Sequence, residues 1–255
     1  MAHPSLSVLE HQLVAYRRTW RGTIFSSLLL PILFFVGMGI SVGAFVDRAG
    51  TLGYPYQDYI APGLLASTAL QVAIGEVSWP VLGGLLWHRT YHAMRVTSLR
   101  PIDIMAGVLE YALLRVALSS AGFLLVMAGF GTVHSLWGAL AFPVCLLLGV
   151  AVATPMFAYT SSVGHENMLV VVFRFGLIPM TLFAGVFFPV ANLPLAARWL
   201  AYASPLWHGV ELCRAATLGT PVAWSVAGHV GYLAAWAVIG FVLARARFDK
   251  RLEDL

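Results

Sequence analysis

The sequence predicts an all-α integral membrane protein with six transmembrane helices. Of its 255 residues, 60% are hydrophobic and only 10% are charged, whereas about 25% are charged in an ordinary soluble domain. A soluble domain of this size needs more polar residues to cover its surface, so the soluble enzyme classes are excluded. A helix that crosses a bilayer needs about 20 apolar residues, and apolar runs of this length recur along the chain.

Six apolar runs of spanning length are separated by short polar segments, and each is predicted to be a transmembrane helix. They cover residues 23–46, 59–87, 104–131, 137–159, 168–188 and 222–244. We therefore expect a transmembrane domain over residues 23–245, followed by a charged tail at 246–255.

The polar segment 1–22 is predicted to form an amphipathic helix at the membrane surface, although a frayed N-terminus is the alternative. Its apolar side chains recur at helical spacing, at Leu6, Leu9 and Leu13. Basic residues and Trp20 follow at its end, as is typical of helices that lie in the membrane interface.

The basic residues predict the orientation, because cytoplasmic loops carry an excess of lysine and arginine. If both termini are cytoplasmic, ten of the fifteen basic residues lie inside and three lie outside. These residues are dispersed between apolar runs, which argues against a nucleic-acid-binding patch. We expect both termini in the cytoplasm.

The segment 189–220 contains three prolines, at positions 189, 194 and 205, and two short helical patterns. Both patterns are too short to span a bilayer. Non-helical backbone at membrane depth is tolerated only where protein or a water-filled cavity surrounds it. We expect re-entrant helices on the outer side, which form either a plug over a pathway or an outer cap.

Ionisable residues inside membrane spans are costly and suggest function by default. Four occur here: Glu76, Glu110, Arg115 and Arg174. A structural ion pair and a role in transport are both compatible with them. Near the predicted outer end, Phe183, Phe187, Phe188, Trp207 and His208 form either an aromatic belt at the interface or a hydrophobic gate.

The order of these elements resembles the permease subunit of type-2 ABC exporters, in the branch that exports nodulation factors, drugs and polysaccharides. The residues that carry the resemblance are Tyr59–Leu64, Arg89–Pro101, Phe183–Pro189, Leu193–Pro194 and Pro205–His208, extending to Arg214. It implies a bacterial plasma membrane protein that exports an amphipathic, drug-like or glycan- or lipid-linked substrate. It also implies a second permease chain, the same or related, and a separate ATP-binding subunit that holds ATP and Mg²⁺.

The sequence itself supports a separate ATPase subunit. A phosphate-binding loop needs a glycine-rich turn followed by lysine, and the only lysine, Lys250, has no such turn before it. We therefore expect neither enzymatic activity nor a cofactor in this chain.

The resemblance implies that the loop 88–103 contacts the ATP-binding subunit, whereas the residues alone are equally compatible with an ordinary positive cytoplasmic loop. Arg89, Arg95 and Arg100 supply charge, and Met94 and Leu99 supply apolar contacts.

Two other classes of function are weaker alternatives. Ser161, Ser162, His165 and Glu166 suggest an intramembrane hydrolase, but no Gly-x-Ser-x-Gly or His-Glu-x-x-His motif is present. An ion-coupled secondary transporter or channel often has broken helices in matching halves, and the only broken segment here follows the fifth span. His88 and His92 are four residues apart but have no further metal ligands nearby.

Overall fold

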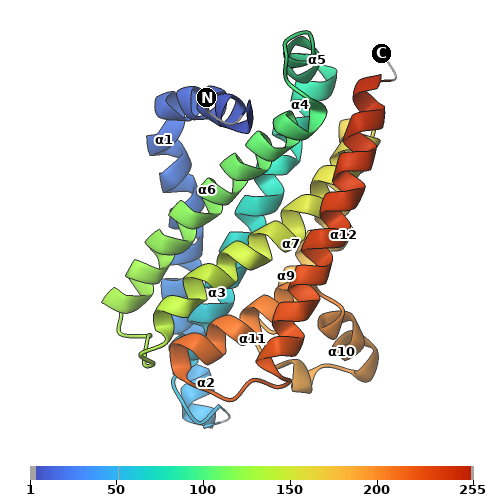
Figure 1. Cartoon of the computed structure of the whole chain (residues 1–255). Coiled ribbons are helices and arrows are strands. Elements are labelled where there is room, and N and C mark those ends of the chain that lie inside the picture. Colours follow the sequence, from blue (N-terminus) through green and yellow to red (C-terminus); the bar gives the residue numbers. More distant parts are fainter. Residues whose placement is uncertain (1–3, 51, 254–255) are drawn as a thin grey trace.

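The computed structural model describes residues 4–50 and 52–253, apart from the side chains of residues 23, 24, 26, 27 and 40. In this part of the chain all regular structure is helical (Figure 1), as predicted. The main helices are α1 (Pro4–Gly37), α2 (Gly43–Ala49), α3 (Tyr56–Val77), α4 (Trp79–Leu86), α5 (Thr90–Arg95), α6 (Pro101–Gly129), α7 (Ala141–Ser162), α8 (Glu166–Val172), α9 (Ile178–Phe183), α10 (Leu195–Tyr202), α11 (Pro205–Leu218) and α12 (Val226–Glu253). Two π-helical turns, Met38–Val42 and Phe173–Leu177, join α1 to α2 and α8 to α9.

Among the described residues, five helical segments are long and apolar enough to cross a membrane. They are Tyr56–Leu86, Pro101–Gly129, Gly138–Ser162, Glu166–Phe183 and Val226–Glu253. Each overlaps a predicted span. Within the run predicted at 23–46, Leu28–Gly37 is a shorter apolar helix among the described residues. The helix changes to a π-helical turn at Met38 and continues as α2.

Two helices end at other residues than the predicted spans. The fifth span ends at Phe183 rather than at residue 188, because the chain turns at Gly185, whose φ of 79° favours glycine. The last helix continues through Glu253, so most of the predicted tail is helical. Its residues, among them Arg, Leu, Lys and Glu, are good helix formers.

The N-terminal turns of α1 lie across the end of the bundle, and the rest of the helix runs along it (Figure 1). The buried side of these turns is shifted from the predicted one. Ser5 and Val8 are buried, whereas Leu6 is exposed. Both ends of the chain lie at the same end of the bundle as α5 (Figure 1).

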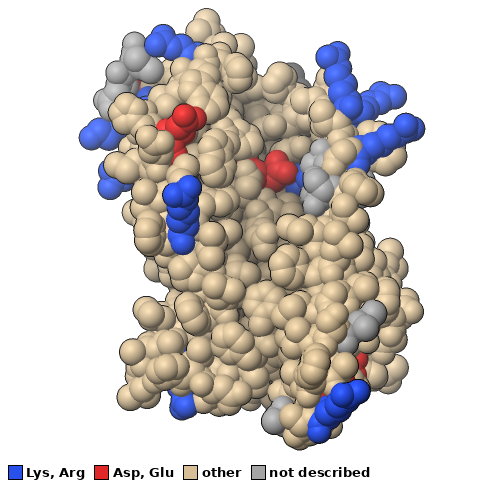
Figure 2. Space-filling view, turned by 180° about the vertical axis from the view of Figure 1, so that it is seen from behind, with Lys and Arg blue, Asp and Glu red and all other residues tan. Residues whose placement is uncertain are grey.

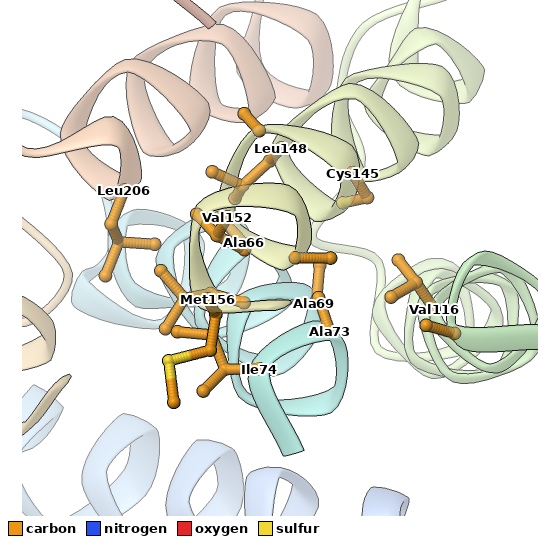
Figure 3. Close-up of a cluster of buried hydrophobic side chains, with 14 of the residues drawn as sticks. Ala66, Ala69, Ala73, Ile74, Val116, Cys145, Leu148, Val152, Met156 and Leu206 are labelled. Carbon is orange, nitrogen blue, oxygen red and sulfur yellow. The ribbon is translucent and has the colours of Figure 1, made fainter. Parts of the chain in front are cut away.

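The centre of the bundle is α3, which is buried along most of its length. Ala66, Ala69 and Ala73 lie beside Leu148 and Val152 of α7 (Figure 3). Small side chains on one helix let its neighbour approach closely, which is how helices associate in a bilayer.

Two glycines mark the closest helix contacts. A Cβ atom at Gly240 of α12 would lie 2.6 Å from the backbone nitrogen of Pro155 in α7. A Cβ atom at Gly107 of α6 would lie 2.7 Å from the carbonyl oxygen of Ser5 in α1. Only glycine fits at these distances, so both positions hold the bundle in this arrangement.

The outer helices expose large apolar side chains. On α1 these include Leu30, Leu33 and Phe34; Phe175 of the second π-helical turn and Ile178 of α9 are exposed as well. A soluble protein rarely leaves this much contiguous apolar surface open, so lipid or another protein chain covers these faces.

Candidate functional site

A groove of about 260 Å³ lies between α1, α3 and α9. Its apolar walls include Leu30 and Phe34 of α1 and Leu177 and Leu182 of the α8–α9 segment. The face of the molecule seen in Figure 2 is hollowed at its centre, and most of the surface there belongs to uncharged residues.

A wider depression of about 910 Å³ continues from this groove and shares Leu182 and Phe187 with it. Phe188, Pro189 and Asn192 extend the lining of the depression. Groove and depression therefore form one continuous surface that leads away from the end of the bundle where α5 lies.

The five aromatic residues predicted as a belt or gate fall into three environments. Phe187 and Phe188 line the wider depression. Phe183 faces a different pocket, beside Leu200 and Trp236. Trp207 and His208 are 2% and 1% exposed, so only the first pair lies on the groove surface.

The turn that carries Phe187 and Phe188 is fixed by three hydrogen bonds. The carbonyl oxygen of Gly185 accepts from the hydroxyl of Tyr59 at 3.1 Å and from the guanidinium of Arg214 at 2.8 Å. The hydroxyl of Tyr56 donates to the carbonyl oxygen of Phe187 at 3.0 Å. The turn is thus attached to both α3 and α11.

The buried pair Trp207 and His208 belongs to an aromatic cluster that joins α10, α11 and α12. His208 Nε2 lies 3.0 Å from the carbonyl oxygen of Tyr202, and the Nδ1 atoms of His208 and His229 lie 2.8 Å apart. A carbonyl only accepts, so His208 Nε2 donates to it. In a neutral ring His208 Nδ1 then accepts from His229 Nδ1. No pattern in the sequence indicates this pairing, because His229 is 21 residues away from His208.

The intramembrane charges are only partly paired. Arg115 of α6 donates to Glu76 of α3 at 2.9 Å, and its guanidinium lies 4.8 Å from the ring centre of Tyr16. Glu110 accepts from the hydroxyl of Ser5 at 3.0 Å. The contact of Arg115 with Tyr16 and the hydrogen bond between Ser5 and Glu110 attach the N-terminal turns of α1 to the bundle.

Arg174 differs from these residues. It is exposed within the π-helical turn Phe173–Leu177, and none of the salt bridges between described residues includes it. An arginine within a membrane span generally faces protein or a water-filled cavity rather than lipid.

The loop 88–103 protrudes at the end of the bundle, where α5 is seen in Figure 1. Arg95 is exposed and Val96 is 89% exposed, while Met94 and Leu99 are half-buried against the core. Arg89 has a φ of 48°, which is uncommon for a residue other than glycine.

Two contacts attach this loop to the rest of the bundle. The ring of Tyr91 lies 5.7 Å from the ring of Phe248 in α12, and Phe248 in turn contacts Phe157 of α7 at 5.1 Å. Arg100 pairs with Asp103 at 3.1 Å at the start of α6. The sequence prediction did not include Tyr91 and Phe248, although aromatic residues beside a basic loop were a visible signal.

His88 and His92 do not belong to any group of metal ligands among the described residues. Among the described residues, no group of three or more histidine, cysteine or acidic side chains is arranged to hold a metal ion. Burial and the charges of Arg89 and Arg251 lower the pKa of His92 from its usual 6.5.

A family profile of ABC-2 type transporters matches residues 6–218. The chain is also 29% identical to nodulation protein J of Rhizobium leguminosarum bv. viciae over 247 residues, which is 97% of this chain and 94% of that protein. It is 30% identical to nodulation protein J of Rhizobium leguminosarum bv. trifolii, with 97% and 93% coverage. For nodulation protein J of Rhizobium meliloti (strain 1021) the identity is 27%, with the same coverage.

The profile covers most of the chain, and the relatives match along nearly its whole length. The matched family is one of membrane permeases that lack ATP-binding motifs, so an ATP-binding partner subunit is implied. This chain is a permease of the ABC-2 type transporter family.

Proposed function

We propose that this chain forms the translocation pathway of an ATP-driven exporter, together with a second permease chain and a separate ATP-binding subunit. The cargo proposed is an amphipathic molecule that leaves the cytoplasm of a bacterium. The observation that carries this proposal is the loop 88–103, which presents basic and apolar side chains at the end of the bundle shared by both termini.

The proposed topology has six spans with both termini cytoplasmic. The two ends of the chain lie at the same end of the bundle, on opposite sides of it (Figure 1), and basic side chains gather toward that end (Figure 2). Cytoplasmic segments carry such an excess of arginine and lysine. In this topology the apolar part of α1 is the first span, and the segment 189–220 lies on the outer side.

The loop is proposed to transmit movement from the ATP-binding subunit. Arg95 and Val96 are free to contact a partner, while Tyr91 ties the base of the loop to α12 through Phe248. A force on the exposed turn therefore reaches α12 and α7 directly, since Phe248 also contacts Phe157.

The groove between α1, α3 and α9 is proposed as part of the pathway, and Phe187 and Phe188 as its outer constriction. A ring of apolar side chains closes a pore by excluding water. The exposed apolar faces of α1 and of the α8–α9 segment are proposed to adjoin the second permease chain across this pathway.

The test is coupled transport in proteoliposomes that contain the permease and its ATP-binding subunit. A double variant, Arg95→Ala with Leu99→Ala, should insert and fold normally but lose at least about 90% of ATP-driven transport. Arg17→Ala serves as the matched control, because Arg17 is an exposed arginine at the same end of the bundle. Unchanged coupled transport in the double variant would remove the loop from the mechanism, and transport without any ATPase would contradict the proposed function.

A further inference from the structure

The only two cysteines of the chain, Cys145 and Cys213, meet in the folded protein. They are 68 residues apart in the sequence, on α7 and α11, yet their sulfur atoms lie 3.9 Å apart. Both are free thiols, and both side chains are 0% exposed. A cysteine can fill a core position simply as a small apolar residue, so the surroundings of the pair decide whether it does more.

The two helices approach each other closely where the cysteines lie. The sulfur of Cys213 is also 3.9 Å from the carbonyl oxygen of Ala141, one turn before Cys145 on α7. One turn before Cys213 on α11, a Cβ atom at Gly209 would lie only 2.7 Å from Leu148 Cδ2. Ala141, Cys145 and Leu148 share one face of α7 because they recur at helical spacing. α11 therefore lies directly against this face.

The distance between the two sulfur atoms is short enough for a covalent bond to form after a small rearrangement. A disulfide has an S–S length of about 2.04 Å, so the sulfur atoms have to approach each other by about 1.9 Å. Rotation about the two Cα–Cβ bonds provides part of this movement, because each sulfur can take more than one staggered position. α11 is a short helix between two loops, and a small shift of this helix provides the rest.

The position of the pair in the bundle favours oxidation. α11 lies at the end of the bundle opposite α5 (Figure 1), and in the proposed topology this end lies outside the cytoplasm. Disulfides form and persist in the bacterial periplasm, whereas thiols in the cytosol are kept reduced. The inference that follows rests on this part of the proposed function.

We propose that Cys145 and Cys213 are joined by a disulfide, formed while the outer end of the bundle assembles. The oxidant is the protein disulfide of a thiol oxidase in the cell envelope. One cysteine thiolate attacks this disulfide and releases one oxidase thiol, and the second then attacks the mixed disulfide and releases the other. One S–S bond forms in the permease and one breaks in the oxidase, which keeps the two electrons and two protons as a pair of thiols.

The burial of both cysteines determines when this exchange takes place. A thiol in apolar surroundings is inert, and an oxidase cannot reach a sulfur that is 0% exposed. The exchange therefore precedes the packing of α11 against α7. After packing, the same burial shields the bond from reductants, so the folded protein keeps it.

The disulfide secures a helix that does not cross the membrane itself. α11 has only 14 residues, and Arg214, next to Cys213, donates to the carbonyl oxygen of Gly185 at 2.8 Å. The bond therefore attaches the turn at Gly185, through α11, to α7. It also closes a long loop of the chain, which restricts the unfolded state and stabilises the folded one.

The first measurement counts free thiols in the full chain, expressed with its ATP-binding subunit in a bacterium. Cells are quenched with acid, and the chain is unfolded in detergent with a polymer-linked maleimide that adds one tag to each free thiol. Most of the chain is expected to gain no tag without reductant and two tags after reduction. Chain from cells that lack the envelope thiol oxidase should gain two tags from the start. Cys145→Ala and Cys213→Ala each leave one cysteine and calibrate the single tag.

The second measurement is the midpoint of thermal unfolding, which shows whether the bond belongs to the native fold. Permease from cells with the oxidase should unfold roughly 4–16 °C higher than permease from cells without it, the gain typical of a native disulfide in a chain near this size. The matched control is the double variant Cys145→Ala with Cys213→Ala, which cannot form the bond. It should unfold at the same temperature whichever cells it comes from.

Two tags on chain from cells with the oxidase would overturn the disulfide, and so would equal unfolding temperatures from the two kinds of cell. The side of the membrane is measured separately with Leu136→Cys in the double variant. Leu136 is fully exposed, and the neighbouring Ser135 donates its backbone N–H to the carbonyl oxygen of Thr217 in α11 at 2.9 Å. A membrane-impermeant maleimide should label this cysteine in intact cells.

These outcomes separate the disulfide from the proposed function. Labelling of Leu136→Cys together with a reduced pair would overturn the disulfide alone, whereas no labelling together with a reduced pair would also reject the proposed topology. ATP-driven transport is measured on the same preparations. A disulfide without any such transport would support the bond and reject the exporter.

Discussion

The contact between α7 and α12 allows the packing of the bundle to be tested by adding a single methyl group. Gly240 of α12 is buried against α7, and a Cβ atom there would lie 2.5 Å from Pro155 Cδ and 2.6 Å from Pro155 N. It would also meet the hydroxyl of Thr154, which donates to the carbonyl oxygen of Ala237 in α12. Ordinary contacts of a Cβ atom begin at 3.4 Å, so the two helices must separate by nearly 1 Å.

Gly240→Ala is therefore expected to destabilise the protein. Overpacking of a tight contact costs about 1–3 kcal/mol, while replacing glycine by alanine within a helix returns up to about 1 kcal/mol. The matched control is Gly231→Ala on the same helix, where a Cβ atom meets nothing within 4 Å. Gly231→Ala should therefore gain only the stability, up to about 1 kcal/mol, that alanine adds to a helix in place of glycine.

The measurement is the midpoint of thermal unfolding of both variants in one detergent, followed by tryptophan fluorescence. A difference of about 1–3 kcal/mol between the variants corresponds to roughly 2–12 °C, at 2–4 °C per kcal/mol for a chain near this size. If Gly240→Ala unfolds at the same temperature as Gly231→Ala, α7 and α12 do not pack as described.

Two further predictions concern charged groups. Arg115→Gln leaves the Glu76 carboxylate without its ion pair and should cost about 3 kcal/mol. The double variant with Glu76→Gln should recover part of this loss, and strictly additive effects in chemical denaturation would show that the pair is not coupled. The second prediction is that acidification loosens α5. Burial and the charges of Arg89 and Arg251 lower the pKa of His92, so the folded state favours its neutral ring. The contribution of the neutral ring to stability is complete above pH 6.5 and is lost as the pH falls below that value. The protection factors of the amides in residues 88–99, which correct for the pH dependence of intrinsic exchange, should fall in this range and should stay constant in His92→Gln.

The sequence was sufficient for much of the helical organisation, because length and hydropathy determine which segments can cross a bilayer. It did not reveal the early end of the α-helix at Gly37 or the π-helical turn at Met38. The residues immediately before and after this turn are all apolar or glycine, so hydropathy does not mark its position.

The sequence also could not predict which side chains distant along the chain pair with one another. The partner of Arg115 is Glu76, 39 residues away, and helical periodicity relates only residues within one helix. Two polar residues of α3 that line the groove between α1, α3 and α9 were overlooked for a different reason. Ser67 and Gln71 carry no charge, and only the burial of Ser67 and the position of both residues on the groove distinguish them from ordinary polar residues in a span.

The aromatic residues near the outer end illustrate a further limit. Phe187 and Phe188 face the groove surface, whereas Trp207 and His208 are buried between helices. A short helix such as α11 has too few turns for its apolar pattern to show which side faces the core.

The two bonds accepted by the carbonyl oxygen of Gly185 have a mechanical consequence. Tyr59 of α3 and Arg214 of α11 both donate to this single atom, and the Arg214 guanidinium also lies 4.1 Å from the ring centre of Tyr59. The turn with Phe187 and Phe188 therefore moves with both helices as one rigid body. Any widening of the depression at this end that preserves these bonds therefore has to come from movement of the other elements that line it, such as the segment with Met38 and Val42.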